Sequence, residues 1–465
     1  MLDTVSPNPP DLFEPPRPKS LSTMPALFRA MFTQDGNLIE LLPREAYKIM
    51  IGNLGYSRRS IVIINDATAI RSILTDPVGI YPKNDLMVGA LAPLVGESVF
   101  VSSGEKWRRQ RAMIAPAFHH MKLSKAFQSM KAAVDDYETL LDERAVSGET
   151  FSLDLTMSHL TADVICRTVF STPLASKTAH EVFDSFSYFE RSVAHVEIKR
   201  LIIEPAWSEI PQSDDVLAAC ERIRRHLGQL VDSHLEEGAA FQDIATEIIA
   251  AQDSESGAHF TRSELIDQLG VFFLAGHETT ASALTWAFYV LATRSDILTR
   301  IREEVERVTG GEELDFSHIR ALDLTRSVFK ESMRLYPPIT FIPRVAAENT
   351  EILGRKIKKG AMVMIAPWVV HRHQAYWKNP HSFDAERFMA HREADILPNT
   401  YMPFGLGPRV CVGANFATIE ATLILARLCR KYDFAVLPGQ TVKPVARLTT
   451  RPKDQIMIRA IRRSR

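Results

Sequence analysis

Cysteine is scarce in this chain. Only four cysteines occur among 465 residues, and they are Cys166, Cys220, Cys411 and Cys429. No two of them form a Cys-x-x-Cys pair, and their spacing fits neither a zinc site nor a disulfide framework. So few thiols in a long chain are typical of a reducing compartment, and we therefore expect a cytoplasmic protein.

The chain also lacks an excess of charge and a long apolar run. Its 55 basic and 56 acidic residues give a net charge of −1, so nothing draws the whole molecule towards nucleic acid or an anionic membrane. No segment approaches the ~20 apolar residues that cross a bilayer. The N-terminus lacks the basic stretch and apolar core of a secretory signal. We expect no transmembrane anchor, no nucleic-acid partner and a monomer.

Repeats and low-complexity stretches are missing after about residue 20. Residues 1–20 are rich in proline and are predicted to be extended. Helical periodicity dominates the rest, with the best candidates at 122–144, 213–236, 263–292, 297–309, 325–335 and 415–430. Strand-like stretches are fewer, at 61–64, 351–352 and 362–365. Because no boundary is visible, we predict one mostly α domain with small β-sheets over residues 21–465.

The candidate at 263–292 is the longest helix, and it contains an unusual polar motif. Thr261 and Glu264 form a capping-box pair at its start, and its middle is apolar all round, which is typical of a buried helix. The motif reads Ala275-Gly276-His277-Glu278-Thr279-Thr280. A buried glycine costs up to about 1 kcal/mol relative to alanine, and threonine hydroxyls can bond back to a carbonyl and bend the helix. We predict local room for a small ligand or water; a helix end near Gly276 is the alternative.

The most informative stretch is a glycine-punctuated loop around one cysteine. It reads Phe404-Gly405-Leu406-Gly407-Pro408-Arg409-Val410-Cys411-Val412-Gly413. Glycines permit a tight loop, and a helix that begins just after Cys411 directs its free N–H groups towards the sulfur. Arg409 adds positive charge, and each of these effects lowers a thiol pKa. The pattern favours a metal-binding thiolate, although a lone cysteine is more often buried and inert.

This loop matches the pattern Phe-Gly-x-Gly-x-Arg-x-Cys-x-Gly and resembles the haem-ligand loop of the cytochrome P-450 monooxygenases. The resemblance implies that Cys411 is the axial thiolate ligand of the iron of haem b. It implies that Phe404, Gly405 and Gly413 are part of the cofactor site. It also implies the mostly α cytochrome P-450 fold, in which a long central helix lies over the haem.

The motif of the central helix resembles the oxygen-activation motif of the same family. The resemblance implies that Thr279 hydrogen-bonds the dioxygen and that Glu278 relays protons. It implies that Ala275 and Gly276 leave space over the haem. His277 lies at a position that the family varies. For this histidine, as for His371 and His373, a structural or solvated side chain is expected rather than a metal ligand.

Arginines are the natural partners of the two haem propionates. Trp107 and Arg111 match a Trp-x-x-x-Arg helix of the family, and Arg344 and Arg409 match two further propionate contacts. A Glu-x-x-Arg pair that stands before Leu-Tyr-Pro-Pro resembles a structural pair of the family. The pair is Glu331 and Arg334, and Arg387 would complete a buried triad. The family usually has proline where this chain has Ala385.

The implied reaction inserts one oxygen atom of O2 into an apolar substrate. The chain ends 54 residues after Cys411 and has no Gly-x-Gly-x-x-Gly or ferredoxin-type cysteine cluster. We therefore expect electrons from NAD(P)H to arrive through a separate ferredoxin and ferredoxin reductase, or a flavodoxin. Lys106, Arg108 and Arg109 would make the thiolate side basic and steer an acidic donor. A peroxide-driven haem-thiolate peroxygenase and a non-catalytic haem sensor are the alternatives; the first would not need Glu278 and Thr279.

By resemblance, the substrate pocket draws on several apolar stretches of the chain. The residues expected to line it are Leu86, Met87, Leu91, Phe272, Ala275, Ile339, Phe341 and Ile342. Such a lining suits a bulky or long apolar molecule, for example a fatty acid, terpenoid, carotenoid or steroid-like compound.

Overall fold

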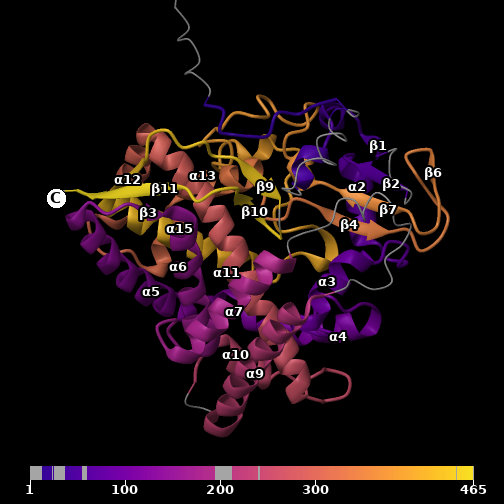
Figure 1. Cartoon of the computed structure of the whole chain (residues 1–465), viewed down its shortest axis with the longest axis horizontal. Coiled ribbons are helices and arrows are strands. Elements are labelled where there is room, and N and C mark those ends of the chain that lie inside the picture. The colour runs from indigo at the N-terminus through magenta and orange to yellow at the C-terminus, as the bar shows by residue number, and fades with distance from the viewer. Residues whose placement is uncertain are drawn as a thin grey trace, which may run out of the picture.

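A single long helix, α11 (Arg262–Thr293), runs through the middle of the molecule (Figure 1). The structure is a computed structural model that describes residues 13–22, 25, 37–54, 60–193, 212–238, 241–446 and 448–463. The predicted capping box is present, with Thr261 and Glu264 exchanging hydrogen bonds between side chain and backbone. The helix continues without interruption past Gly276, so the alternative of a helix end there is wrong.

Further helices surround α11 and give the molecule a roughly triangular outline, with α9 towards one corner (Figure 1). They are α2 (Ala67–Thr75), α3 (Asp85–Val95), α4 (Gly104–Ile114), α5 (His120–Ser147), α6 (Leu153–Phe170), α7 (Lys177–Val193), α9 (Asp214–Glu237), α10 (Ile244–Ile249), α12 (Ser295–Thr309), α13 (Asp323–Leu335), α14 (Pro367–Val370) and α15 (Ala414–Lys431).

The β structure is confined to small sheets. The strands are β1 (Ile51–Leu54), β2 (Ile61–Ile64), β3 (Phe151–Ser152), β4 (Ile342–Val345), β5 (Thr350–Ile352), β6 (Arg355–Ile357), β7 (Met362–Ile365), β8 (Tyr432–Val436), β9 (Pro444–Ala446), β10 (Thr450–Pro452) and β11 (Met457–Arg462). A four-stranded sheet has the order β1-β2-β7-β4, in which only β2 and β7 pair in parallel, and a three-stranded sheet has the order β3-β11-β8. The pairs β5–β6 and β9–β10 complete the described strands. The predicted mostly α architecture with small sheets is confirmed.

All of the helices and strands expected from periodicity are present. The six predicted helices correspond to α5, α9, α11, α12, α13 and α15, and the ends of β2 and β7 match the prediction. Helix α6 was not predicted because most of its residues are buried. A helix that is enclosed by neighbours shows no polar face, so it gives no amphipathic signal.

The core is built around α11 and its neighbours. The aromatic side chains Trp286 and Phe288 of α11 are fully buried, and Trp286 stacks on Tyr336 after α13 at a centroid distance of 3.9 Å. A second apolar cluster lies at the four-stranded sheet, where Ile64 and Ile365 are fully buried. This framework fixes both α11 and the loop before α15, which carry the two motifs of the sequence.

None of the helices in the described part of the chain combines the length and the hydrophobicity that a membrane span needs. The division into a proline-rich segment at residues 1–20 and one domain at 21–465 stays a prediction.

Candidate functional site

Helix α11 opens to solvent at one place only along its buried stretch. Between Leu265 and Leu291 every residue is buried except Ala275, Gly276 and Thr279. Ala275 and Thr279 are four residues apart and so share one face of the helix. The hydroxyl of Thr279 donates a hydrogen bond to the Ala275 carbonyl at 2.7 Å. Its oxygen is then left as an acceptor for a further partner on the open face.

Gly276 has a packing role that the sequence did not indicate. A Cβ at this position would lie 2.4 Å from Cδ1 of Ile165, a residue of α6. The missing side chain therefore allows α6 to approach α11 closely. We correct the expectation that Gly276 makes room over the cofactor, because the position faces the neighbouring helix.

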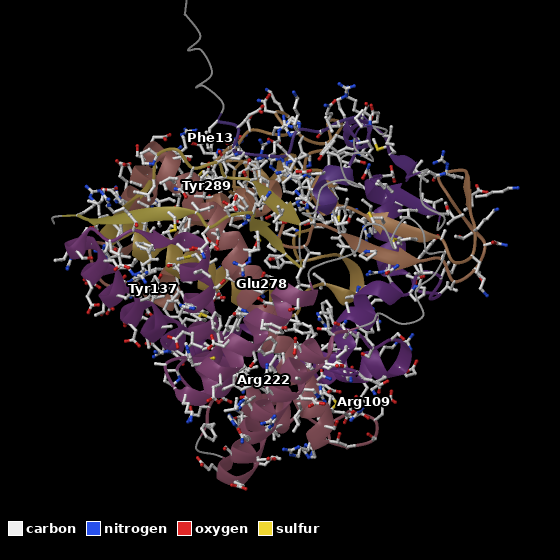
Figure 2. The ribbon with its side chains drawn as sticks, viewed as in Figure 1. Phe13, Arg109, Tyr137, Arg222, Glu278 and Tyr289 are labelled. Atoms are coloured by element: carbon white, nitrogen blue, oxygen red, sulfur yellow. The ribbon has the colours of Figure 1, made fainter. Side chains whose placement is uncertain are left out.

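Glu278 lies near the centre of the molecule (Figure 2) and is held by residues from the C-terminal part of the chain. Its Oε1 accepts hydrogen bonds from Thr449 Oγ1 at 2.6 Å and Arg451 Nε at 2.8 Å, and its Oε2 pairs with Arg451 Nη2. Burial opposes ionisation, but the Arg451 guanidinium outweighs it and lowers the pKa of Glu278 to about 2. Glu278 is therefore an ionised, tightly bound carboxylate at neutral pH.

A second acid approaches the same region from α7. The oxygen and nitrogen atoms of Glu190, His277 and Glu278 lie within 4.8 Å of one another. Three such groups could hold a metal ion, but Arg451 already occupies both oxygens of Glu278. We interpret the cluster as an ion-pair network. The expectation that His277 is a structural histidine agrees with its burial.

Backbone geometry fixes the loop that precedes α15. The Cys411 N–H donates to the Phe404 carbonyl at 2.9 Å, and the Gly405 N–H donates to the Met402 carbonyl at 3.1 Å. Gly407 has a φ of 74°, and a Cβ there would lie 2.6 Å from the backbone oxygen of Leu74. This glycine is thus required both by its left-handed conformation and by the close contact with α2.

Cys411 is exposed to solvent as a residue, yet many protein atoms surround its sulfur. This burial raises the pKa of the thiol, and the Gly413 backbone N–H and the Arg111 charge offset it only in part. The expectation of a lowered pKa is wrong for the polypeptide alone, because desolvation outweighs the donors. Arg409 is not among the groups that affect the sulfur. Coordination to a metal would deprotonate the thiol outright.

Three cationic side chains meet beside this loop. They are Lys83, Arg344 and Arg409, and none forms an ion pair with a carboxylate of the described residues. Burial, Arg409 and Arg344 together lower the pKa of Lys83 to about 7. Burial and Arg344 lower the pKa of Arg409 to about 10. Such a cluster costs free energy unless an anion neutralises it.

The arginines of this cluster also have donors to spare. Arg409 stacks over the Trp107 ring at 4.3 Å and donates to the Ser102 carbonyl at 3.1 Å, but its Nη1 is buried without a hydrogen-bond partner. Arg344 is 7% exposed. The residues present therefore fit a ligand that carries carboxylates, as haem does. Sequence reasoning missed Lys83, which reaches the site through an isolated β-bridge to Arg344 that no local pattern reveals.

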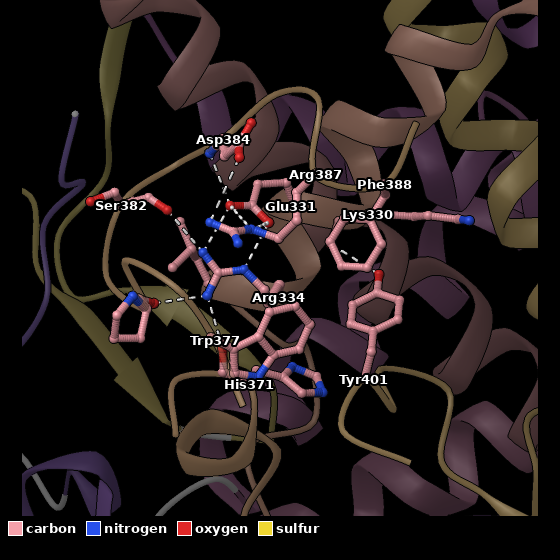
Figure 3. A network of polar contacts seen from close by, with 12 residues as sticks. Lys330, Glu331, Arg334, His371, Trp377, Ser382, Asp384, Arg387, Phe388 and Tyr401 are labelled. Carbon is pink, nitrogen blue, oxygen red and sulfur yellow. Dashed lines mark hydrogen bonds and ion pairs between the residues drawn. The ribbon is translucent and has the colours of Figure 1, made fainter. Parts of the chain in front are cut away.

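The predicted triad is assembled and buried (Figure 3). Arg334 and Glu331 are fully buried and form a bidentate pair at 2.7 and 2.8 Å. Arg387 contacts both oxygens of Glu331 at 3.2 Å. Arg334 also donates to the carbonyls of His371 and Ser382. The triad thus joins α13 to the chain on the way to the cysteine loop.

The residues predicted for the substrate pocket fall into three groups. Leu91 and Phe272 are part of the apolar core, and Phe272 packs on Phe118 at 5.4 Å. Ile339, Phe341 and Ile342 are partly buried, and Ala275 is exposed on the open face of α11. Leu86 and Met87 belong to α3, but their side chains lie outside the described residues.

The basic side chains expected to form a docking face are all paired with carboxylates. Lys106 pairs with Glu97, Arg108 with Glu105, and Arg109 with Glu264. Figure 2 shows Arg109 towards the edge of the molecule, away from Glu278. The expectation is corrected to this extent, because each cation has a carboxylate neighbour. The spacing of Glu105 and Arg108 indicates their pair, whereas the partners of Lys106 and Arg109 could not be found from local spacing.

His371 and His373 are both buried and hydrogen-bonded. Nε2 of His371 accepts from the Met402 N–H at 2.9 Å, and burial lowers the pKa of His371 to about 3. Nε2 of His373 lies 3.2 Å from the Ile49 carbonyl oxygen. The expectation that these are structural histidines is confirmed.

Comparison with known proteins matches this arrangement to one family. The family model named Cytochrome P450 matches residues 21–459. The chain is 31% identical over 359 residues to cyclooctatin synthase of Streptomyces melanosporofaciens, covering 76% of each protein. It is 29% identical over 428 residues to cyclooctat-9-en-7-ol 5-monooxygenase of the same organism, covering 90% of this chain and 87% of the relative.

The fold leads to the same group. The crystal structure of a cytochrome P450, CYP102L1, superposes with a TM-score of 0.80 at 23% identity, covering 98% of this chain and 100% of that one. The expectation drawn from the cysteine loop and the central helix is thereby confirmed at the level of family and fold. The chain belongs to the cytochrome P450 family and is a haem-dependent monooxygenase.

Proposed function

We propose that this protein inserts one oxygen atom of O2 into a bulky apolar substrate, most closely a terpenoid, with electrons from a separate redox partner. Two features of the chain support this proposal. Helix α11 has an accessible face at Thr279, and the Cys411 loop lies beside three cations that have no carboxylate partner among the described residues. The names of the two Streptomyces relatives support the substrate class, since one of them is a monooxygenase of an unsaturated alcohol.

The chain offers a complete set of groups for haem. We assign Cys411 as the iron ligand, and Arg344, Arg409 and Lys83 as the propionate partners. When bound, the thiolate-ligated haem supplies the chemistry that activates dioxygen and cleaves its O–O bond. Trp107 contributes because its ring stacks against the guanidinium of Arg409 and holds it in place.

Arg111 and the loop residues complete the cofactor side. Burial lowers the pKa of Arg111, and the negative charge of a Cys411 thiolate opposes this shift, since the two groups interact electrostatically. We propose that Arg111 stabilises negative charge at the sulfur. Phe404, Gly405 and Gly413 shape the loop around it, and the Gly413 N–H favours the thiolate.

The distal side of the site is formed by α11. We propose that the Thr279 hydroxyl accepts a hydrogen bond on the open face while it continues to donate its own hydrogen to the Ala275 carbonyl. Glu278 carries protons to this face. It is ionised and bound to Arg451 in the resting arrangement, so it must first take up a proton and then leave Arg451 to deliver it.

The apolar substrate is expected to meet Ala275 and the segment between α13 and β4. Ile339, Phe341 and Ile342 are partly exposed there and offer apolar surface. Leu91 and Phe272 are packed in the apolar core. We propose a ferredoxin with its NAD(P)H-dependent ferredoxin reductase, or a flavodoxin, as the donor.

Spectroscopy of the haem protein tests the site. The reduced carbon monoxide complex should show the red-shifted Soret band of a thiolate ligand, and Cys411→Ser should abolish that band. A wild-type band at the position found for histidine ligation would refute the assignment of Cys411.

Turnover tests the reaction class. Product should form with NADPH, ferredoxin and ferredoxin reductase, and O2 consumption should depend on all three. Turnover with peroxide but not with this redox chain would favour the peroxygenase alternative. The absence of turnover with either would favour a sensor. A panel of terpenoids, fatty acids and steroids, scored by the haem spin-state shift, tests the substrate class.

A further inference from the structure

The hydrogen bonds of His277 determine which of its ring nitrogens can exchange a proton. Nδ1 lies 2.8 Å from the carbonyl oxygen of Phe273. A carbonyl can only accept, so Nδ1 carries a hydrogen in every protonation state. Nε2 is therefore the nitrogen that gains or loses a proton, and it lies 3.3 Å from Oε1 of Glu190.

The surroundings of this pair permit little net charge. The His277 side chain is 1% exposed, and the rings of Phe183, Phe186 and Phe273 pack around it. An uncompensated charge in such a place is costly. Glu278 and Arg451 neutralise each other next to the pair. Glu190 and His277 are then expected to hold one exchangeable proton between them, as a charged pair or as two neutral groups, since both forms have no net charge.

The pKa shifts agree with a shared proton. Burial and the charge of Glu278 raise the pKa of Glu190 to about 7. Although burial works in the opposite direction, Glu190 and Glu278 raise the pKa of His277. The pair therefore holds a proton near neutrality that either member can release.

Apart from Arg451, the titratable groups that lie beside Glu278 in the described part of the chain are the two members of this pair. Arg451 cannot be deprotonated in a protein, and Thr449 is a neutral hydroxyl. The side chain of Glu190 is 13% exposed and that of Glu278 is 6% exposed, so Glu190 is the more exposed of the two acids. One carboxylate oxygen of Glu190 lies within 4.8 Å of one of Glu278, and a side-chain rotation or one bridging water can close this gap.

We propose that Glu190 and His277 form a proton-entry relay that reprotonates Glu278 during turnover. The inference rests on the proposed function, in which Glu278 delivers protons to the open face of α11. Oxidation of a substrate RH consumes O2, two electrons and two protons and yields ROH and H2O. The electrons come from the redox partner. In the relay, an O–H or N–H bond breaks at the pair, an O–H bond forms at Glu278, and solvent restores the proton at Glu190.

The chain contains a matched pair that serves as a control. His234 also donates from Nδ1 to the carbonyl four residues before it, Leu230, at 2.8 Å, and its Nε2 lies 2.9 Å from Asp243 Oδ2. Both side chains are at most 3% exposed. This pair joins α9 to the start of α10 and makes no contact with Glu278. A variant there disturbs a buried histidine–carboxylate pair without touching the relay.

The test compares Glu190→Gln, His277→Asn, Glu278→Gln and Asp243→Asn as haem-loaded proteins with the same redox chain and substrate. Glutamine keeps the shape of Glu190 but exchanges no proton. Asparagine keeps a donor near the Phe273 carbonyl but lacks Nε2, and it provides a second test should Glu190→Gln not fold. The measurements are product formed per O2 consumed, hydrogen peroxide released, the solvent deuterium isotope effect on turnover, and substrate affinity from the spin-state shift.

We expect Glu190→Gln and His277→Asn to lower the rate of product formation about tenfold. This is less than the ~10²–10⁴-fold contribution of a directly positioned acid, because slower water-borne routes remain. The solvent isotope effect and peroxide release should rise, while substrate affinity stays unchanged. Asp243→Asn should alter stability only. Infrared spectra of the resting protein should also show a carboxylic acid band that titrates near neutrality and disappears in Glu190→Gln.

The outcomes separate the two levels of the argument. Normal coupling and an unchanged isotope effect in both relay variants, together with a large loss in Glu278→Gln, would overturn the relay and leave the proposed role of Glu278 intact. Normal turnover in Glu278→Gln would overturn that role itself. Equal losses in Asp243→Asn and Glu190→Gln would show that the pair is merely structural, which also overturns the relay.

Discussion

Replacing Arg334 by methionine should sharply reduce the stability of the protein. Arg334 is fully buried and makes five hydrogen bonds, two to Glu331 and one each to the carbonyls of His371, Pro380 and Ser382. Methionine retains much of the stem but none of the donors. The change leaves Glu331 with fewer partners and strands three acceptors in a buried place.

The magnitude follows from these contacts. Removing one member of a buried ion pair costs about 3–5 kcal/mol, and each buried acceptor left unpaired costs about 1–3 kcal/mol. These terms overlap, and Arg387 and the Asp384 N–H still bind Glu331. We therefore expect the free energy of unfolding to fall by about 3–5 kcal/mol, a large part of the ~5–15 kcal/mol of a typical domain.

Guanidinium unfolding, followed by tryptophan fluorescence and haem absorbance, measures this loss. Arg392→Met is the matched control, because Arg392 forms a bidentate pair with Asp384 in a partly exposed place, where an ion pair contributes about 0–1 kcal/mol. Arg334→Lys keeps the charge but not the planar fork, and should fall between the two. A loss in Arg334→Met no larger than that in Arg392→Met would refute the reasoning.

Three further predictions concern buried charge. Burial holds the pKa of Glu420 well above its usual range, so the folded protein retains a proton there that the unfolded chain releases above about pH 4.3 and stability falls as pH rises. Glu420→Gln should raise the guanidinium midpoint at pH 8 but not at pH 4, and an equal effect at both would contradict this. The pKa of Lys83 is about 7 in the folded protein, so the stability of the haem-free protein should rise between pH 7 and about pH 10.4. Lys83→Met should abolish that rise. The same variant should also lose haem to apomyoglobin faster. Arg451→Met removes the cation that lowers the pKa of Glu278, so a second infrared carboxylic acid band should appear near neutrality beside that of Glu190, and this second band should be absent when Glu278→Gln is added.

Much of the scaffold could be predicted because its signals are local. The capping box of Thr261 and Glu264 located the start of α11, and the short run of four apolar residues in β7 located a strand. The Tyr-Pro-Pro turn that follows Glu331 and Arg334 singled out this pair from several pairs with the same spacing. Helix α6 gave no such signal. Its neighbours enclose it, so its sequence does not alternate between a polar and an apolar face with helical periodicity.

The electrostatics of the site could not be predicted in the same way, because they depend on contacts between distant segments. Lys83 joins the cationic cluster through pairing with Arg344, which is far away in sequence. The expected low pKa of Cys411 failed because desolvation by the whole fold outweighs two local donors. The expected basic patch failed for a related reason, since Arg109 meets Glu264, 155 residues further along the chain.

Glu278 shows why a motif alone does not determine proton delivery. Its own neighbours in sequence include a histidine, yet the pKa of its carboxyl depends on burial and on Arg451, 173 residues away, more than on that histidine. With Arg451 alone, Glu278 would be a fixed anion and a poor proton carrier. The pair of Glu190 and His277 changes this, because it places an exchangeable proton beside the carboxylate without adding net charge. A proton arriving at Glu278 weakens its pairing with Arg451, since a neutral acid is no longer attracted to the guanidinium. In the proposed mechanism, protonation by the relay therefore comes first and allows the Glu278 side chain to leave Arg451.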